Sequence, residues 1–316
     1  MKAVQVLQFR KPPTLSTVPI PQPSPSQVLI KVQYSPVNPA DLATILGKYL
    51  GKPLAPCVLG VEGSGEVVAE GREVRGMIGK RVSFFTQGGA WAEYATADWQ
   101  NTIEISNSDM KQAACFSINP LTSLLLLKSF QGNSFLINAG ASVLSQLLIK
   151  QAAIDHITAI AIVRRPEARP ELEAMGAQVL IQGSEQYLSA LQSLKKEGKR
   201  VLDAVDLIGG KATADLFNAL SPGGVVHIVG NMSLRPLSGI DDRAMRYENK
   251  QLIGFYLHHA WSALPRSQQS EYIKALLSTY RSTLSLPITG EHQLASFEAA
   301  MAAAKCHAGK QVLTLV

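Results

Sequence analysis

The sequence predicts a mixed α/β protein with a β-rich domain followed by a doubly wound parallel sheet. With 316 residues, the chain exceeds the roughly 100 to 200 residues usual for one domain. Its first third contains short β-branched or alternating runs separated by Pro and Gly, whereas later apolar strands alternate with helical segments. Strands joined by helices form βαβ units, which require a parallel sheet covered on both faces. This alternation is typical of a dinucleotide-binding domain.

The β-rich part extends to about residue 107. The proline-rich tract at residues 19–25 lacks many backbone donors and is expected to be an extended loop. The predicted strands are Ala3–Val6, Val28–Tyr34, Gly65–Ala69, Arg81–Phe85 and Trp91–Thr96.

Helices and strands alternate from about residue 108. The predicted helices are Asp109–Phe130, with a break near Asn119–Pro120, Ser142–Ala153, Glu167–Met175, Tyr187–Lys195 and Lys211–Leu220. The predicted strands are Ser134–Asn138, Ile157–Val163, Gln178–Ile181, Val201–Leu207, Gly224–Val229, Leu252–Leu257 and, after a long helical stretch, Gln311–Leu315. We expect domains at residues 1–118 and 119–260, with residues 261–316 returning to the first domain.

Composition and charge exclude several classes of protein. Hydrophobic residues make up 46% and charged residues 17%, as in a compact globular chain. The net charge of +6 comes from scattered cations without a polybasic arm, so we expect no nucleic-acid partner, whereas a phosphorylated ligand is favoured. The most apolar stretch, residues 121–127, is too short to cross a membrane and predicts a buried helix. Without a signal sequence, we expect a cytoplasmic protein with no membrane partner.

The three cysteines are Cys57, Cys115 and Cys306. They form no C-x-x-C pair, so the sequence predicts neither a disulfide framework nor a cysteine zinc site. Each is expected to be a buried thiol.

The turn at residues 138–145 follows a predicted strand and opens a helix, which is the position of a dinucleotide phosphate loop. Its small residues allow close approach of a pyrophosphate to the helix N-terminus. However, Val143 and Ser145 stand where glycines are usual, so a tight turn without a ligand remains an alternative.

Arg164 and Arg165 follow the next strand, about 20 residues further on. An acidic residue there would bind the ribose hydroxyls of NAD, whereas a guanidinium pairs with a 2′-phosphate. Arg164 therefore favours NADPH, the alternative being a solvated arginine pair.

Several motifs occur in an order that resembles the medium-chain dehydrogenase/reductase superfamily over nearly the whole chain. The motifs are Asn38–Asp41 with Gly47–Tyr49, Gly60–Gly65, Gly79–Val82, Asn119–Thr122, Gly223–Gly224 and Gly309–Val312. Within the superfamily, the chain is most similar to the quinone oxidoreductase branch and to mitochondrial-type 2-enoyl thioester reductases. The resemblance implies a GroES-like catalytic domain, a Rossmann NADPH-binding domain and a homodimer.

Metal catalysis is not expected. Zinc members of the superfamily have Cys where this chain has Asn38, and His where it has Val61, and neither residue here replaces those ligands. His258 and His259 are not expected to bind one metal ion, because neighbours on a strand point to opposite faces. Reduction without zinc needs a hydrogen-bond donor or acid for the developing enolate.

The resemblance implies that Tyr49 is the proton donor or polarising group and that Asn38 orients the ring or the carboxamide. A packing role for Tyr49 is the alternative. The implied cofactor contacts are Asn119, Thr122, Ala141, Ser142, Val143, Leu144, Arg164, Arg165, Val229, Gly230, Asn231, Met232, Phe255, Tyr256, Leu257, His258 and Lys310.

The favoured function is NADPH-dependent reduction of the activated C=C bond of a 2-enoyl thioester or enone. A quinone oxidoreductase and a non-catalytic NADPH sensor are the alternatives. The sequence contains no nucleophile elbow, so a hydrolase has no support. A strand near residues 224–229 or 252–257 is expected to form the dimer interface.

Overall fold

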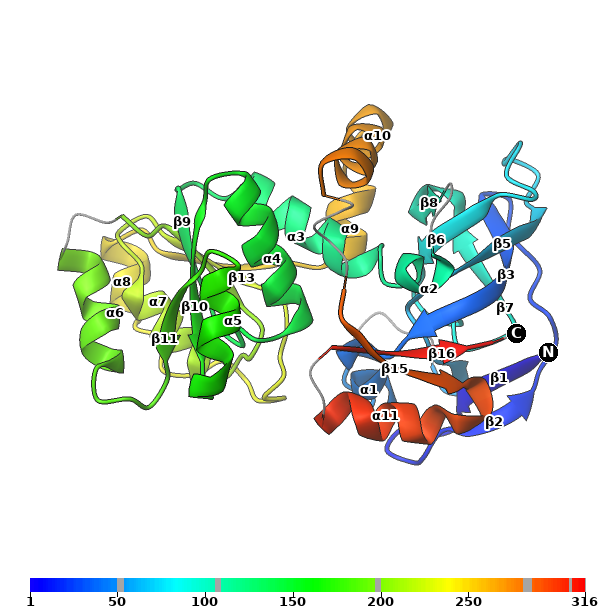
Figure 1. The fold of residues 1–316 in the computed structure, drawn as a ribbon, viewed down its shortest axis with the longest axis horizontal. Coiled ribbons are helices and arrows are strands. Elements are labelled where there is room, and N and C mark those ends of the chain that lie inside the picture. Colours follow the sequence, from blue (N-terminus) through cyan, green and yellow to red (C-terminus); the bar gives the residue numbers. More distant parts are fainter. Residues whose placement is uncertain (50–53, 106–108, 197–199, 281–285, 307–308, 316) are drawn as a thin grey trace. The chain divides into compact units, whose positions relative to one another are not determined.

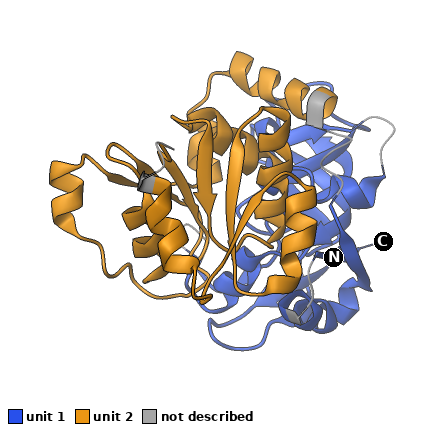
Figure 2. Ribbon diagram, turned by 60° about the vertical axis from the view of Figure 1, so that its left-hand side comes forward, with its two compact units in different colours: residues 1–119, 285–316 blue, residues 120–284 orange. Residues whose placement is uncertain are grey.

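The computed structural model describes residues 1–49, 54–105, 109–196, 200–280, 286–306 and 309–315. The chain divides into two compact units, residues 1–119 with 285–316 and residues 120–284 (Figure 2). The second unit extends to residue 284, whereas the sequence predicts a boundary at residue 260.

Unit 1 contains a three-stranded and a seven-stranded sheet (Figure 1). The smaller sheet has the order β2 (Thr14–Thr17), β1 (Lys2–Val6), β4 (Cys57–Val58). The larger has the order β15 (Ile288–Gln293), β16 (Lys310–Thr314), β3 (Gln27–Pro36), β5 (Glu62–Glu70), β6 (Arg81–Phe85), β8 (Thr102–Glu104), with β7 (Tyr94–Asp98) also pairing with β3. Since β16 pairs with β3, the end of the chain completes a sheet that begins near residue 27.

The core of unit 1 lies between its sheets and the helix α11 (Phe297–Cys306). Val28, Ile30 and Val32 alternate along β3 and are buried, together with Phe297 and Ala300 of α11. Trp91 is also completely buried. The segment predicted as a strand, Trp91–Thr96, forms the regular strand β7 only from Tyr94. The remaining helices of this unit are α1 (Pro39–Ile45), the 3-10 turns Trp99–Asn101 and Leu294–Ser296, and α2 (Met110–Ala113).

Unit 2 contains a six-stranded parallel sheet. Its order is β11 (Gln178–Ile181), β10 (Thr158–Val163), β9 (Ser134–Ile137), β12 (Asp203–Asp206), β13 (Val225–Ile228), β14 (Gln251–Gly254). Renumbered from β9, this is the 3-2-1-4-5-6 order of doubly wound dinucleotide-binding folds. The predicted fold class is therefore confirmed.

Helices cover both faces of this sheet because alternate strand residues point to opposite sides. Phe135 and Ile137 belong to one core, whereas Leu136 belongs to the other. The first core includes residues of α3 (Ile118–Ser129), α4 (Val143–Ile154) and α5 (Arg169–Ala174), and the second includes residues of α6 (Tyr187–Lys196) and α7 (Ala212–Ala219). The further helices are the 3-10 turn Pro166–Ala168, α8 (Asp242–Tyr247), α9 (Leu257–Ser262), α10 (Arg266–Ala275) and the π-helical turn Leu276–Tyr280.

The structure corrects the prediction for the segment after residue 254. The predicted strand Leu252–Leu257 ends at Gly254, and α9 begins at Leu257. Leu257 and Trp261, four residues apart, are both buried, so one helical face is apolar. The prediction that His258 and His259 are neighbours on a strand, with side chains on opposite faces, is wrong because both lie in α9.

A second correction concerns the proposed dimer strands. Residues 225–228 form β13, an inner strand paired with β12 and β14 on its two sides. β13 therefore has no free edge, and of the two candidates only β14 lies at the margin of the sheet.

The buried leucines at residues 121–127 lie in α3, as predicted. Pro120 falls in the first turn of this helix, where its missing N–H is not needed, so the expected break is the start of α3. In the described part of the chain, no helix combines the length and apolar character that crossing a membrane requires.

Candidate cofactor edge and buried polar centre

The candidate cofactor residues of unit 2 share one edge of its sheet. All six strands are parallel, so their carboxyl ends meet at the same edge, which is where ligands bind in doubly wound folds. The segments that follow β9, β10, β13 and β14 are those predicted to contact the cofactor, namely Ala141–Leu144, Arg164–Arg165, Val229–Met232 and Phe255–His258.

The turn after β9 packs tightly on the neighbouring strand. Gly140 N donates to Ile162 O at 2.9 Å, and a Cβ on Gly140 would lie 2.9 Å from Ala161 Cβ. Ser142 caps α4, accepting from Ser145 N at 3.2 Å. Ser145, at the position of a usual glycine, contacts Ser142 Oγ at 2.9 Å and donates to Ala139 O. Hydroxyl contacts thus close this turn without the usual glycines.

The carboxylate of Asp206, at the end of β12, joins three elements at this edge. It accepts from Asn138 Nδ2 at 2.6 Å, from Thr213 Oγ1 at 2.5 Å, and from the backbone of Ile208 and Gly209. Asp206 is fully buried, so these four bonds compensate for its lost hydration. Asp206 was not identified from the sequence. An acidic residue ending a buried strand was the available signal.

Arg164 and Arg165 follow β10 and are both exposed. Among the described residues, neither guanidinium has an ion pair or hydrogen-bond partner in the protein. Two free guanidinium groups therefore stand beside the turn after β9, as a 2′-phosphate would require.

The segments after β13 and β14 complete the edge. Gly230 is packed so that a Cβ would meet Leu207 O at 2.9 Å. Asn231 is exposed, and its amide donates to Arg235 O at 3.2 Å. Tyr256 lies against His258, with ring centroids 5.2 Å apart.

In unit 1, a buried polar centre surrounds Asn38. Lys310 Nζ donates to Asn38 Oδ1 at 2.5 Å, and Asn38 Nδ2 donates to Glu62 Oε1 at 3.1 Å. Lys310 Nζ also lies 3.6 Å from Glu62 Oε1. The centre lies at the N-terminus of α1, where Asp41 accepts from the backbone N–H groups of Asn38 and Gly60. The structure thus brings together Asn38 and Lys310, which are far apart in sequence.

Cys115 lies close to this centre and is completely buried. Burial raises the pKa of its thiol to about 12, and the nearby Lys310 opposes this only partly. Cys57 is buried as well, so both are the core thiols that the sequence predicted, whereas the side chain of Cys306 lies outside the described part.

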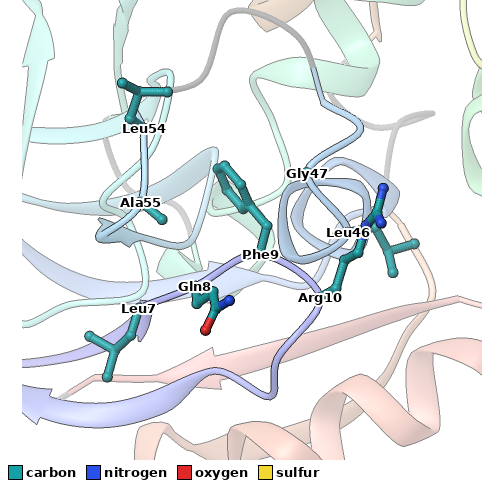
Figure 3. A pocket seen from close by; sticks show the side chains of 8 residues that line it. All are labelled: Leu7, Gln8, Phe9, Arg10, Leu46, Gly47, Leu54 and Ala55. Atoms are coloured by element: carbon teal, nitrogen blue, oxygen red, sulfur yellow. The ribbon is translucent and has the colours of Figure 1, made fainter.

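Tyr49 lies in the loop after α1 and is half-buried; residues 50–53 are outside the described part. Gly47 precedes it with a φ of +66° and packs against the ring of Phe9. An open pocket of about 600 Å³ adjoins this loop (Figure 3). The pocket is lined by Leu7, Gln8, Phe9, Arg10, Leu46, Gly47, Leu54 and Ala55.

Asn119 and Thr122 lie at the start of α3. Asn119 is half-buried and Thr122 is buried. Ile118, the first residue of the helix, donates its backbone N–H to Glu62 Oε2 at 3.0 Å. Glu62 belongs to the Gly60–Gly65 motif but is not among the predicted site residues. Its position within an apolar strand is the signal for a buried, paired acid.

The residues of this centre do not suit zinc. Asn38 offers an amide whose oxygen already accepts from the Lys310 ammonium, and that ammonium would repel a cation. Val61 is buried and has no donor atom in its side chain. The donor set of unit 2, by contrast, suits a phosphorylated dinucleotide.

The strand order and this edge define the fold class of dinucleotide-binding proteins. Residues 24–107 match the alcohol dehydrogenase GroES-like domain. The chain is 31% identical over 279 residues to the mitochondrial enoyl-[acyl-carrier-protein] reductase of Caenorhabditis elegans, which covers 84% of this chain and 79% of that relative.

Solved structures agree over the full length. A protein from Mesorhizobium loti described as an NADPH:quinone reductase is 27% identical, with a TM-score of 0.88 over 99% of this chain and 98% of its own. A mycobacterial protein complexed with NADPH is 25% identical, with a TM-score of 0.87 over 99% of this chain and 100% of its own. The chain belongs to the medium-chain dehydrogenase/reductase superfamily, in its zinc-independent branch.

Proposed function

We propose that this chain is an NADPH-dependent reductase of the activated C=C bond in a 2-enoyl thioester or enone. The observation that carries the proposal is the pair of free guanidinium groups, Arg164 and Arg165, at the cofactor edge of the sheet. The relatives named above support the class of reaction, since one is an enoyl reductase and another is complexed with NADPH.

The bound cofactor would be held by Ala141–Leu144, Arg164, Arg165, Val229–Met232, Phe255–His258, Asn119, Thr122 and Lys310. NADPH supplies a hydride for the β-carbon of the acceptor. The chain must stabilise negative charge on the carbonyl oxygen and deliver a proton to the α-carbon. The Tyr49 phenol can do either, because its O–H both donates a hydrogen bond and carries a transferable proton. Asn38, fixed by Lys310 and Glu62, would orient the phenol or the carboxamide of the cofactor.

The pocket beside Gly47 favours an acyl substrate over a quinone. Three of its leucines are exposed, Leu54 to 85%, so its walls offer apolar surface that a saturated tail would bury. If the pocket receives this tail, KM should fall as the enoyl chain lengthens from four to about ten carbons. Each buried CH₂ adds about 0.8 kcal/mol of binding free energy, which corresponds to a fall of about fourfold in KM.

The substitution Tyr49→Phe tests the proposed role. We expect kcat with a crotonyl thioester to fall by roughly 100-fold, the range of general acid catalysis, while the NADPH dissociation constant stays constant. Tyr247→Phe is the matched control, because Tyr247 is exposed on α8.

The alternatives predict other outcomes. A quinone oxidoreductase needs no protein acid, so Tyr49→Phe would leave quinone turnover unchanged and thioester turnover absent. A non-catalytic sensor would bind NADPH without oxidising it in the presence of enones, enoyl thioesters or quinones. Absence of NADPH binding would refute all three functions.

We further propose a homodimer that pairs through the free edge of β14. Its Ile253 is 45% exposed, and an edge strand presents unpaired backbone groups.

We also propose a cytoplasmic location, although the relative from Caenorhabditis elegans is mitochondrial. Fractionation of cells that express the tagged chain checks this, and recovery with mitochondria would contradict it.

A further inference from the structure

The Glu62 carboxylate is completely buried and faces donors on all sides. Its Oε1 accepts from Asn38 Nδ2 at 3.1 Å and lies 3.6 Å from Lys310 Nζ. Its Oε2 accepts from Ser117 Oγ and from Ile118 N, each at 3.0 Å. Three hydrogen-bond donors and the Lys310 ammonium therefore face the carboxylate, and the single proton of Ser117 is shared between Glu62 Oε2 and Phe84 O, which also lies 3.0 Å away.

The local sequence explains why Glu62 can be buried. On the same strand, a Cβ on Gly63 would lie 2.8 Å from Tyr34 O, and one on Gly65 would lie 2.1 Å from Lys31 O. The two glycines therefore let β3 pack closely on β5, and Ser35 Oγ donates to Glu62 O at 2.6 Å. The backbone of Glu62 is held as firmly as its side chain.

These contacts leave the Asn38 amide a single orientation. The Lys310 ammonium only donates, so it must face Oδ1, and the Glu62 carboxylate only accepts, so it must face Nδ2. A flipped amide would place donor against donor and acceptor against acceptor, which is costly in a buried site. The second N–H of Asn38 is thereby directed before any ligand arrives.

Glu62 also fixes the beginning of α3. The bond from Ile118 N to Oε2 holds the residue before Asn119, which is a candidate cofactor contact. One carboxylate thus connects Asn38, Lys310 and the Ile118–Asn119 backbone, three parts of the chain that the proposed reaction uses.

We propose that Glu62 is a positioning residue for reduction: it holds the Asn38 amide, the Lys310 ammonium and the start of α3 in one arrangement. The inference rests on the proposed function. Preorganised groups cost no reordering during reaction, so the loss of Glu62 should reduce kcat more than it raises KM.

The test compares Glu62→Gln with Glu62→Asp and with the control Glu66→Gln. Gln offers a single oxygen, so its NH₂ group must face either Asn38 Nδ2 or the donors Ser117 and Ile118 N. We expect kcat for enoyl thioester reduction to fall roughly 10- to 100-fold in Glu62→Gln, with KM within about threefold. Glu62→Asp keeps the charge and should recover part of kcat. Glu66, exposed on the same strand, should be replaceable without effect.

Thermal unfolding and NADPH titration accompany the kinetics. An unchanged kcat in Glu62→Gln, or a fall of equal size in Glu62→Asp and Glu62→Gln, overturns the inference alone. If Glu62→Gln does not fold, Ser117→Ala decides: a several-fold lower kcat supports positioning, and wild-type kcat overturns it. If the unmodified chain does not oxidise NADPH with any acceptor, the proposed function fails, and the inference fails with it.

Discussion

At the scale of single residues, the proposed choice of cofactor depends on Arg164 and Arg165. Arg164 and Arg165 are exposed, and among the described residues neither has an ion-pair partner. The nearest acidic residue in sequence, Glu167, is exposed as well. Their position after β10 is the one that the proposed recognition of a 2′-phosphate requires.

Replacing Arg164 by Ser should raise the NADPH dissociation constant by roughly 10- to 100-fold, the value of one to two charge-assisted hydrogen bonds. NADH binding should be unaffected, since NADH lacks the 2′-phosphate. Fluorescence titration with both cofactors measures this. Arg243→Ser is the control, because Arg243 is ion-paired with Asp241 on the surface. Equal losses for NADPH and NADH would contradict the assignment.

Gly140 is required because a side chain would not fit beside the neighbouring strand, and not because its backbone has a positive φ. In Gly140→Ala, the new methyl group meets Ala161 Cβ and Ile162 O, which should destabilise the fold by about 1–3 kcal/mol. Gly254→Ala is the control, since no atom lies within 4 Å of its added Cβ. Urea unfolding of both variants measures the difference, and equal stabilities would show that the turn tolerates a side chain.

The strand β12 ends in Asp206, whose carboxylate accepts four hydrogen bonds. Asp206→Ala leaves the buried Asn138 amide and Thr213 hydroxyl without their acceptor and should cost about 3 kcal/mol. The exposed Asp242 on α8 serves as the control for Asp→Ala. Denaturant unfolding compares the two, and a loss below about 1 kcal/mol would mean that the bonds to Asp206 are replaced by water.

The strand β15 is linked to α2 by an ion pair that depends on pH. Lys111 Nζ lies 2.7 Å from Glu291 Oε2, and this hydrogen bond lowers the pKa of Glu291 and raises that of Lys111. The contribution of Glu291 is therefore present above the pKa of an unfolded glutamate and is lost as pH falls through its lower folded pKa. The urea midpoints of the wild type and Glu291→Gln should differ at pH 7 and converge in acid. A constant difference would contradict the linkage.

The pattern of residues predicted long elements better than short ones. The strands of unit 2 could be predicted, since the apolar runs at Ser134–Ile137 and Thr158–Val163 are bounded by polar turns. β2 and β4 were missed because their residues are mostly exposed or too few to show a period. β15 was missed because its residues alternate only between half-buried and exposed. The predicted strand Leu252–Leu257 extends three residues beyond β14, into the start of α9, because almost no turn signal separates the two elements.

The sequence predicted candidate site residues only where their position relative to a strand or a motif indicated a function. The turn at Gly140 and the arginines after β10 were found from position alone. Asp206 and Glu62 were not, because a buried acid is recognisable only when the partners that satisfy it are known. Asn38 is 24 residues from Glu62, and Asn138 is 68 residues from Asp206. Contacts at such separations are set by topology rather than by local sequence.

At the scale of the whole molecule, the free edge of β14 predicts a dimer. Ile253→Lys places a charge on this edge and should convert the dimer to a monomer, because a charged edge strand resists pairing. Light scattering after size exclusion measures the mass. Ile20→Lys, at an equally exposed isoleucine in unit 1, is the control. A wild-type monomer, or a dimer that persists in Ile253→Lys, would refute this interface.

The pairing of β16 with β3 has a consequence for synthesis on the ribosome. Lys310, the partner of Asn38, is separated from it by 272 residues. All of unit 2 therefore leaves the exit tunnel before unit 1 has its inner strand β16, and residues 34–36 of β3 must wait without this partner. A nascent chain halted before residue 310 would carry a complete sheet in unit 2 and an incomplete seven-stranded sheet in unit 1. Premature termination near the end of the message should therefore yield a target for chaperones rather than a weaker enzyme.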